Sequence, residues 1–258
     1  MLAPQRYEEI LKQLEERGTV RTMALAKELQ VTDETIRKDL QFLSETSQIV
    51  RFHGGASLRN GRPRLRSFHE RRRIEAEKKH AIANLAINLI QPGHTYAFDS
   101  STTVHSVVSI LPNVPIRVIT NAFGVMETLA DLDSIELVST GGQYHKKTQT
   151  FIGNNSLELM HRHKIDVAFI SCVGLDFQRG ASEAFEAQSL FKECLVQIAE
   201  QVILLLDSTK LNKRSEYFFA RTENISCIIT DSGLSEAARK SLAEYGIAYK
   251  IAELGNKQ

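Results

Sequence analysis

Chemistry is concentrated in two short polar runs, DSSTT at residues 99–103 and DSTK at residues 207–210. The first run offers one carboxylate and four hydroxyls directly before VHSVVSIL, an apolar stretch that we interpret as a helix. Hydroxyls and free backbone N–H groups at the start of a helix bind anions, most simply a phosphate. The second run ends in Lys210, a cation that could neutralise such an anion. Together the two runs predict an anion-binding site.

Three further polar endings follow strand-like segments: Thr120-Asn121, Thr140-Gly141-Gly142 and Gly174-Leu175-Asp176. Any one of these endings is more often an ordinary loop or a helix cap. Ligands of open α/β sheets bind at the carboxyl ends of the strands, so five endings of this kind predict one shared site. The chain contains neither GxGxxG nor GxxxxGK[ST], so neither a dinucleotide nor a nucleoside triphosphate is indicated. We expect no cofactor and no metal, since the HxH motif at residues 161–163 has no acid or cysteine at matching spacing.

A second kind of chemistry lies in TDETIRKDL, residues 32–40, where two adjacent cations stand among hydroxyl and carboxylate side chains. Thr32 or Asp33 can cap a helix over ETIRKDLQFLSE. The helix spacing turns Ile36, Leu40 and Leu43 inward and the side chains of Thr35, Arg37 and Lys38 outward. Such a face is either ordinary solvated surface or a surface for DNA, and the neighbouring elements decide between the two.

These neighbours have the layout of a winged helix-turn-helix. PQRYEEILKQLEER predicts an amphipathic helix that ends at Gly18, and Thr22 can cap a short second helix. After the third helix, QIVRFHGGAS alternates like a strand and turns at Gly54-Gly55, which predicts a hairpin, or wing. In this layout the last helix enters the major groove and the wing touches the DNA backbone. The expected DNA-contacting residues are Thr22, Thr32, Glu34, Thr35, Arg37, Lys38, Arg51, His53 and Gly54.

The rest of the chain predicts the scaffold for the polar endings. From Thr95 onward, short β-rich runs alternate with helical stretches, a rhythm typical of a mostly parallel sheet with helices on both faces. The expected strands are TYAFDS, IRVITN, IELVST, DVAFISCVG, VILLLD, CIITD and AYKIAE. The fold class is therefore α/β, with a small winged helix-turn-helix in front of a larger parallel sheet.

Charge is distributed unevenly along the 258 residues, although the net charge is only +1. Residues 1–73 contain 15 Lys and Arg against 10 Asp and Glu, and the remainder contains 17 against 21. A basic end on a mildly acidic body is expected where one end meets a polyanion. No run approaches the ~20 apolar residues of a membrane span. The start lacks the pattern of a signal peptide and the three cysteines are widely spaced, so we expect a cytoplasmic protein with no disulfides and no membrane partner.

The charge pattern also suggests a division into three parts. We expect a DNA-binding domain at residues 1–58, a basic linker at 59–75 and a larger domain at 76–258. The arginines of the linker segment could attract DNA phosphates or could simply keep a linker solvated, and the sequence favours neither interpretation. They include Arg62, Arg64, Arg66, Arg71, Arg72 and Arg73.

TDETIRKDL, with the helix of Arg6, Ile10 and Leu14 before it and IVRFHGGA after it, resembles the helix-turn-helix signature of the DeoR family of bacterial transcriptional regulators. Residues 77–254 look like the sensor domain of that family, which resembles ribose-5-phosphate isomerase and glucosamine-6-phosphate deaminase in fold. The resemblance implies a repressor or activator of a carbohydrate operon whose binding to double-stranded DNA is controlled by a sugar phosphate. It also implies a homo-oligomer, either a dimer or a tetramer.

The family motifs carry over to this chain residue by residue. The D-x-G-T-T loop matches residues 99–103, with Ser101 in place of glycine, and D-x-S-K matches residues 207–210, with Thr209 in place of serine. TN, GG and G-x-D…G match Thr120-Asn121, Gly141-Gly142 and Gly174, Asp176 and Gly180, and the acid-to-lysine helix matches Glu183 and Lys192. The implied effector-binding residues are Asp99, Ser100, Ser101, Thr102, Thr103, Thr120, Asn121, Gly141, Gly142, Asp176, Glu183, Lys192 and Lys210.

DSSTT, FISCVGLD and NNSLEL further resemble the fucose-operon activator branch of the family, which implies a deoxysugar phosphate such as fuculose phosphate. Two alternatives differ in class. A sugar-phosphate isomerase or deaminase with an added DNA-binding domain would need a base at the sugar C2 proton and an acid for ring opening, and Asp176 and Glu183 are the candidates. VGLDFQRGASEAFEAQ lacks the dense acid pair and glycine-rich lysine loop of those isomerases, so we expect no enzyme activity. The second alternative is a sensor of an unphosphorylated metabolite.

Overall fold

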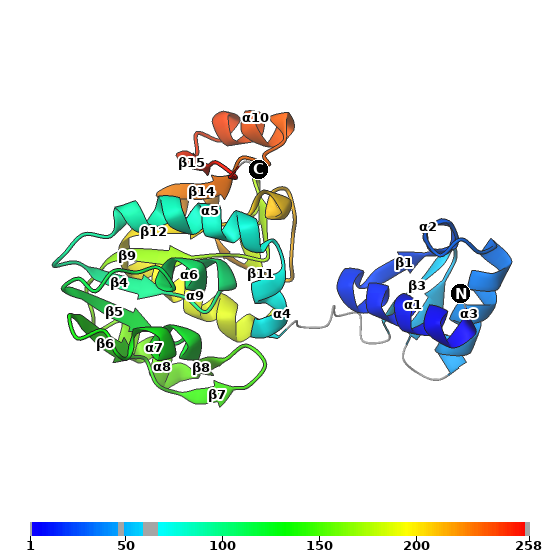
Figure 1. Ribbon diagram of the computed structural model, residues 1–258, viewed down its shortest axis with the longest axis horizontal. Coiled ribbons are helices and arrows are strands. Elements are labelled where there is room, and N and C mark those ends of the chain that lie inside the picture. Colours follow the sequence, from blue (N-terminus) through cyan, green and yellow to red (C-terminus); the bar gives the residue numbers. More distant parts are fainter. Residues whose placement is uncertain (1, 46–48, 59–66, 256–258) are drawn as a thin grey trace. The chain divides into compact units, whose positions relative to one another are not determined.

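The structure of the protein is a computed structural model that describes residues 2–45, 49–58 and 67–255 (Figure 1). The chain forms two compact units, residues 1–65 and 66–258. The linker arginines Arg62, Arg64 and Arg66 lie outside the described residues. No helix among the described residues is long and apolar enough to cross a membrane.

The first unit has three helices and a small antiparallel sheet. Its helices are α1 (Ala3–Arg17), α2 (Thr22–Glu28) and α3 (Asp33–Glu45), and its strands are β1 (Thr19–Arg21), β2 (Ile49–Phe52) and β3 (Gly55–Leu58). The three helices and the β2–β3 wing confirm the predicted layout, since β2 and β3 pair from Ile49 with Leu58 to Phe52 with Gly55. The first strand, β1, was not predicted, because three residues are too few to show alternation.

The core of the first unit is made by the apolar faces that the helix spacing predicted. Ile10 and Leu14 of α1 and Ile36 and Leu40 of α3 are fully buried together with Ile49 of the wing. A two-point ion pair also holds α3 against α1, because Arg6 donates from Nε to Asp39 Oδ2 at 2.7 Å and from Nη2 to Asp39 Oδ1 at 3.0 Å. This pair fixes the direction in which the outer face of α3 points.

The start of α2 differs from the prediction. Thr22 is the first helical residue rather than the N-cap, because β1 keeps the chain extended through Arg21, which pairs with Gly55. The N–H of Thr22 donates to the carbonyl of Gly54 at 2.9 Å and so joins α2 to the turn of the wing. Gly54 has a φ of +86°, and a Cβ on Gly55 would collide with the carbonyl of Val20, so this turn needs both glycines.

The second unit is built on a seven-stranded parallel sheet in the order β15-β14-β12-β9-β4-β5-β6. All seven predicted runs form its strands, which confirms the predicted α/β class. The strands are β4 (Thr95–Phe98), β5 (Ile116–Thr120), β6 (Ile135–Ser139), β9 (Ile165–Ile170), β12 (Ala199–Leu205), β14 (Cys227–Asp231) and β15 (Tyr249–Ala252).

Helices cover both faces of this sheet (Figure 1). Alternate side chains of one strand reach opposite cores, so that Tyr96 and Phe98 pack in one core and Ala97 in the other. The first core contains residues of α5 (Ala76–Ala86), α6 (Thr102–Val108) and α7 (Phe123–Leu129), and the second contains residues of α8 (Asn154–Met160), α9 (Glu186–Ile198) and α10 (Glu236–Glu244).

Short antiparallel pieces of three or four residues each complete the second unit, and the sequence did not predict them. β7 (Gln143–His145) pairs with β8 (Thr150–Ile152), and β10 (Gly174–Asp176), β11 (Gly180–Glu183) and β13 (Tyr217–Ala220) form a second small sheet. Three single 3₁₀ turns are η1 (Ile87–Leu89), η2 (Ser208–Lys210) and η3 (Thr222–Asn224).

Part of the expected linker is a helix of the second unit. α4 (Phe68–Arg73) begins with a capping box in which Glu70 N–H donates to Ser67 Oγ at 3.2 Å and Ser67 N–H donates to Glu70 Oε2 at 2.6 Å. Phe68 is buried edge-on against the His105 ring of α6, with the ring centroids 5.2 Å apart. The structure therefore places residues 67–75 in the second unit, where the sequence suggested a basic linker.

Candidate ligand site and nucleic-acid interface

The chain reverses direction across the sheet between β4 and β9. It runs from β4 outward through β5 to β6 and later returns to β9 on the other side of β4. A crevice at the carboxyl ends of the strands at such a switch point is the usual ligand site of an open α/β sheet. The predicted hydroxyl loop, residues 99–103, follows β4 at this point.

Asp99 fastens this loop to the neighbouring strand. Its Oδ1 accepts the N–H of Ser101 at 2.8 Å, and its Oδ2 accepts the N–H of Ser171 at 2.9 Å, directly after β9. The same Oδ2 lies 3.1 Å from Lys192 Nζ. The carboxylate is fully buried and hydrogen-bonded at both oxygens. Asp99 thus holds the loop after β4 against the end of β9 at the switch point.

Lys192, on α9, is the buried cation of the same cluster. Its Nζ donates to the carbonyl of Ser171 at 2.6 Å and forms a short ion pair with Glu183. Burial alone would lower the pKa of Lys192, but the charges of Asp99 and Glu183 outweigh burial and raise the pKa above its ordinary value. The structure thus brings together three predicted site residues, Asp99, Glu183 and Lys192, as a compact charged cluster.

The hydroxyls of the loop have different partners. Ser101 Oγ caps α6 by accepting the N–H of Val104, Ser100 Oγ accepts from Gln188 Nε2 at 2.9 Å, and Thr102 Oγ1 donates to the carbonyl of Arg71 at 3.4 Å. Thr103 Oγ1 is buried and has no hydrogen-bond partner among the described residues. One hydroxyl of the loop is therefore left without a partner.

Arg71, on α4, brings an unpaired cation to the same place. Its Nε and Nη2 atoms are buried and have no hydrogen-bond partner in the described part of the chain. Burial lowers the pKa of Arg71 below its ordinary value, although the charges of Glu183 and Asp99 act in the opposite direction. Buried guanidinium N–H groups without hydrogen-bond acceptors are costly, and an anion that supplied acceptors would remove the cost.

Two lysines add positive charge beside Arg71. Lys79 Nζ donates to the carbonyls of Arg71 at 2.6 Å and Ile74 at 2.5 Å. Burial, together with the charge of Lys210, lowers the pKa of Lys79 to about 8. Lys210 Nζ lies 3.4 Å from Ser171 Oγ and 3.6 Å from Asp207 Oδ2. Three cations, Arg71, Lys79 and Lys210, thus surround the approach to the hydroxyl loop.

Four further predicted residues lie at or beyond the ends of β5 and β6. Thr120, at the end of β5, donates from Oγ1 to the carbonyl of Phe98 at 2.7 Å, and Asn121 lines a cavity of about 230 Å³ at the same edge. Gly141 and Gly142, beyond the end of β6, have φ angles of +64° and +116°.

Asp176 lies apart from the Asp99 cluster, in the small sheet. Its Oδ1 accepts the N–H groups of Gln178 and Arg179, and its Oδ2 pairs with Arg214. Burial would raise the pKa of Asp176, but the hydrogen bond from Arg214 and those from the turn outweigh burial and lower the pKa. No hydrogen bond between described residues joins Asp176 to the cluster at Asp99.

Sequence reasoning missed Arg71, Lys79, Ser171 and Gln188 at this site. Arg71 belonged to a basic run that suggested a linker, and Lys79 stood in an ordinary charged helix. Ser171 lies at the site because β9 ends directly before it, and Gln188 lies there because of how α9 packs. The signal available for Lys79 was its spacing. It stands three residues before Ile82, at a buried position of the helix.

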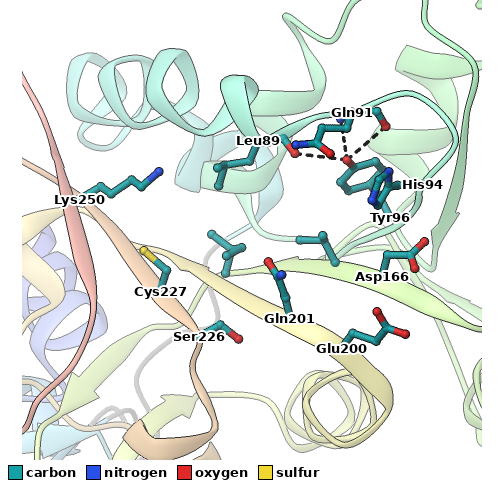
Figure 2. A pocket seen from close by; sticks show the side chains of 12 residues that line it. Leu89, Gln91, His94, Tyr96, Asp166, Glu200, Gln201, Ser226, Cys227 and Lys250 are labelled. Atoms are coloured by element: carbon teal, nitrogen blue, oxygen red, sulfur yellow. Dashed lines mark hydrogen bonds between the residues drawn. The ribbon is translucent and has the colours of Figure 1, made fainter.

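A larger cavity of about 520 Å³ opens at the opposite, amino-terminal edge of the sheet, where Figure 2 shows its lining. The Tyr96 hydroxyl accepts the N–H of Gln91 at 2.7 Å and donates to the carbonyl of Leu89 (Figure 2). Asp166 accepts the N–H of Thr95 and pairs with Lys164. None of the predicted site residues lines this cavity, and none of the unpaired buried atoms of the described chain lies in it. The chemistry therefore favours the carboxyl edge.

The outer face of α3 presents the predicted DNA-contacting side chains. Glu34, Arg37 and Lys38 are exposed and Thr35 is half-buried. Thr32 caps the helix as expected, because its Oγ1 accepts the N–H of Thr35 at 3.2 Å. Free N–H groups at this helix end favour the phosphates of a nucleic acid.

The wing is tied to α3 by its predicted arginine. Arg51 donates from Nη1 to Gln41 Oε1 in a short hydrogen bond, while His53 and Gly54 stand exposed at the turn. A residue that was not predicted, Arg21 of β1, stacks its guanidinium 5.4 Å from the Phe52 ring centroid on the wing. Both arginines are held near the wing.

Comparison with known proteins assigns the two units. Residues 6–61 match the DeoR-like helix-turn-helix domain, and residues 74–232 match the DeoR C terminal sensor domain. The chain belongs to the DeoR family. DeoR-family proteins of this kind are transcriptional regulators, so the recognition from the sequence motifs is confirmed, as is a winged helix-turn-helix followed by an α/β sensor domain.

The relatives of this DeoR-family chain extend along nearly its whole length. They include the uncharacterized HTH-type transcriptional regulator YulB of Bacillus subtilis (32% identical, 95% of each chain) and the HTH-type transcriptional repressor GlcR of the same organism (32%, 98% of each). The L-fucose operon activator of Haemophilus influenzae is 29% identical over 94% of this chain and 97% of its own length. Among solved structures, ribose 5-phosphate isomerase A of Methanocaldococcus jannaschii matches 52% of this chain and 53% of its own at 15% identity, with a TM-score of 0.39. A likeness at that level supports no inference about ligand or activity.

Proposed function

We propose that this DeoR-family protein regulates a carbohydrate-catabolism operon and that a sugar phosphate bound at the carboxyl edge of the sheet controls its binding to operator DNA. The observation that carries the proposal is the set of unpaired buried atoms at this edge: Thr103 Oγ1, Asn121 Oδ1 and the Nε and Nη2 of Arg71. Each unmet buried hydrogen bond costs about 1–3 kcal/mol, so their concentration at one edge favours a ligand that supplies the partners.

The electrostatics favour a phosphate as the anionic part of this ligand. Arg71, Lys79 and Lys210 bring three cations to the edge; Lys210 pairs with Asp207 at 3.6 Å, and Asp99 and Glu183 are paired with Lys192. A phosphate has three strong acceptor oxygens and nearly two negative charges, which suit a guanidinium and a hydroxyl donor. A neutral metabolite would leave the charge of Arg71 unmatched.

The ligand can act on DNA binding only through different affinities for two states of the protein. A ~100-fold difference in ligand affinity between the two states contributes about 2.7 kcal/mol of coupling free energy. Arg71 lies on α4, the first helix after the segment between the two units, so that a bound phosphate would contact the element next to that segment. We infer an oligomer, either a dimer or a tetramer, that reads repeated half-sites with the face of α3 and the wing.

The named relatives suggest where to start among sugars. A protein 29% identical to this chain is named an L-fucose operon activator, which makes fuculose phosphate the first candidate. Catalysis has less support, because Glu183 is paired with Lys192 and Asp176 with Arg214. Neither carboxylate is available as a free base, and the relatives are named as regulators.

Thermal unfolding of the full chain tests the site. We would compare fuculose phosphate, ribose 5-phosphate and glucose 6-phosphate with their free sugars at equal ionic strength. A ligand present at 100 times its dissociation constant stabilises the folded state by about 2.7 kcal/mol. We expect one phosphate, and not its free sugar, to raise the unfolding temperature. Equal effects of a phosphate and its free sugar would refute a phosphate site.

At the DNA interface, Arg37→Ala should weaken binding to the operator by about 1–3 kcal/mol if the side chain reads a base. Arg37 is exposed on the outer face of α3, so the substitution removes a contact without disturbing the core. The measurement is fluorescence anisotropy on operator DNA, with Lys240→Ala on α10 of the second unit as the control. An unchanged operator affinity would exclude Arg37 from the interface.

We expect the protein to take up a proton when it binds phosphate near pH 8. The pKa of Lys79 is lowered to about 8, so this amine is partly neutral there, and a nearby anion raises its pKa and restores the proton. Affinity should accordingly fall as the pH rises above about 8. Calorimetry at pH 8 in buffers of different ionisation enthalpy measures the uptake. Lys79→Met should abolish it and Lys240→Met should retain it, whereas equal uptake in all three proteins would contradict the role of Lys79.

A further inference from the structure

The cavity of about 230 Å³ at the carboxyl edge differs in chemistry from the cationic approach beside it. Its walls combine the polar side chains of Asn121, Gln143 and Asn154 with the apolar side chains of Leu157, Leu190 and Phe191. None of the described residues that line it carries a charged side chain. Such a lining fits a neutral group with hydroxyls on one side and C–H groups on the other.

Asn121 leaves an unmet hydrogen bond at this cavity. The residue is 1% exposed, and its Nδ2 donates to the carbonyl of Phe151 at 3.2 Å, which fixes the orientation of the amide. The Oδ1 atom is buried and has no partner among the described residues. An acceptor of this kind calls for a donor such as a sugar hydroxyl.

The cavity adjoins the hydroxyl loop through both of its walls. Ala187 lines it, and the next residue along α9, Gln188, donates to Ser100 Oγ at 2.9 Å. Asn121 follows Thr120, whose Oγ1 is bonded to the carbonyl of Phe98, the residue before the loop. Residues next to the cavity lining are therefore hydrogen-bonded to the hydroxyl loop or to the residue before it.

We propose that this cavity holds the neutral sugar ring of the effector while Arg71 and its neighbouring lysines hold the phosphate, so that the cavity determines which sugar is recognised. The inference rests on the proposed function. Apolar walls at Leu157, Leu190 and Phe191 favour a ring with an exposed C–H face or a methyl group, as in a deoxysugar. The absence of charged lining side chains among the described residues disfavours a sugar acid or an amino sugar.

A single tryptophan can report on the cavity, because the natural chain contains none. Leu190→Trp places the indole on the rim, and Ile110→Trp, in the turn after α6, is a matched control, since these two side chains are 47% and 40% exposed. Fuculose phosphate, ribose 5-phosphate, glucose 6-phosphate and inorganic phosphate are titrated into both proteins. We expect the sugar phosphate that stabilises the wild-type chain to change the fluorescence of the Leu190→Trp protein alone, and inorganic phosphate to change neither.

Filling the cavity gives an independent test. Ala187→Phe should reduce affinity for that sugar phosphate at least about tenfold, as expected for overpacking of a pocket. Affinity for inorganic phosphate should change less than about twofold, since the cations are untouched. Ala237→Phe, on an exposed position of α10, is the control. The unchanged binding of inorganic phosphate also verifies that the Ala187→Phe protein is folded.

The outcomes separate the cavity from the phosphate site. If a sugar phosphate stabilises the wild-type chain but neither Leu190→Trp fluorescence nor the Ala187→Phe affinity responds, the cavity proposal is wrong and the phosphate site remains. Equal loss of sugar phosphate and inorganic phosphate in Ala187→Phe also refutes it, because the substitution then acts on the anion site. If no sugar phosphate of the panel stabilises the wild-type chain, both proposals fail.

Discussion

Arg71→Met is expected to abolish the response to a sugar phosphate while leaving the unliganded protein at least as stable as the wild type. The Nε and Nη2 of Arg71 are buried without partners among the described residues, so without ligand the cation destabilises the fold. Methionine fills similar space and removes the charge. With ligand, charge-assisted hydrogen bonds of about 1.5–3 kcal/mol each are lost, which corresponds to a loss of affinity of at least about 100-fold.

Two measurements check this expectation on the same protein. Urea unfolding without ligand measures stability, and anisotropy on operator DNA with and without the sugar phosphate measures the response. Arg73→Met is the matched control, because this arginine is exposed on the same helix. Operator binding without ligand should be equal in all three proteins. A marked loss of stability in unliganded Arg71→Met would show that Arg71 supports the fold instead of receiving an anion.

Lys192→Met is expected to produce the largest loss of stability, about 3–5 kcal/mol. The ammonium of Lys192 lies between the carboxylates of Asp99 and Glu183, and all three side chains are buried. Without it, two buried carboxylates are left without their cation, and an uncompensated buried charge is strongly destabilising.

The comparison for this prediction is Lys164→Met. Lys164 also pairs with two acids, Asp166 and Glu200, but its side chain is 72% exposed, so water screens the pairs and its removal should cost far less than that of Lys192. Urea unfolding of both variants gives the two free energies. Similar losses in both proteins would show that the Lys192 cluster is no better shielded from water than a surface pair.

The sequence predicted the elements whose pattern is set locally. The central strands are buried on both faces and form short apolar runs, so β4 and β9 were visible in the predicted runs TYAFDS and DVAFISCVG. The helix face of Ile36 and Leu40 followed from spacing, and Thr32 was visible as a cap. The three-residue strands β1 and β7 are too short to show a period and were missed.

The site was predictable only as far as its residues stand at strand ends. Asp99 and the hydroxyl loop follow β4 directly, and the parallel topology alone places them at the switch point. Arg71 comes from a helix that packs against α6 through Phe68, and no local pattern shows that its guanidinium is buried. The cavity at Asn121 depends on the packing of α9 beside β8, which only the folded chain reveals.

The most direct test of sugar-phosphate control is fluorescence anisotropy of the full chain on its own upstream DNA, with fuculose phosphate, ribose 5-phosphate and glucose 6-phosphate each compared with its free sugar. We predict that one of these sugar phosphates shifts the affinity of the chain for DNA and that its free sugar does not. Tight DNA binding that no sugar phosphate alters, under conditions where the phosphate is bound, would leave the helix-turn-helix assignment intact and contradict control from the carboxyl edge of the sheet.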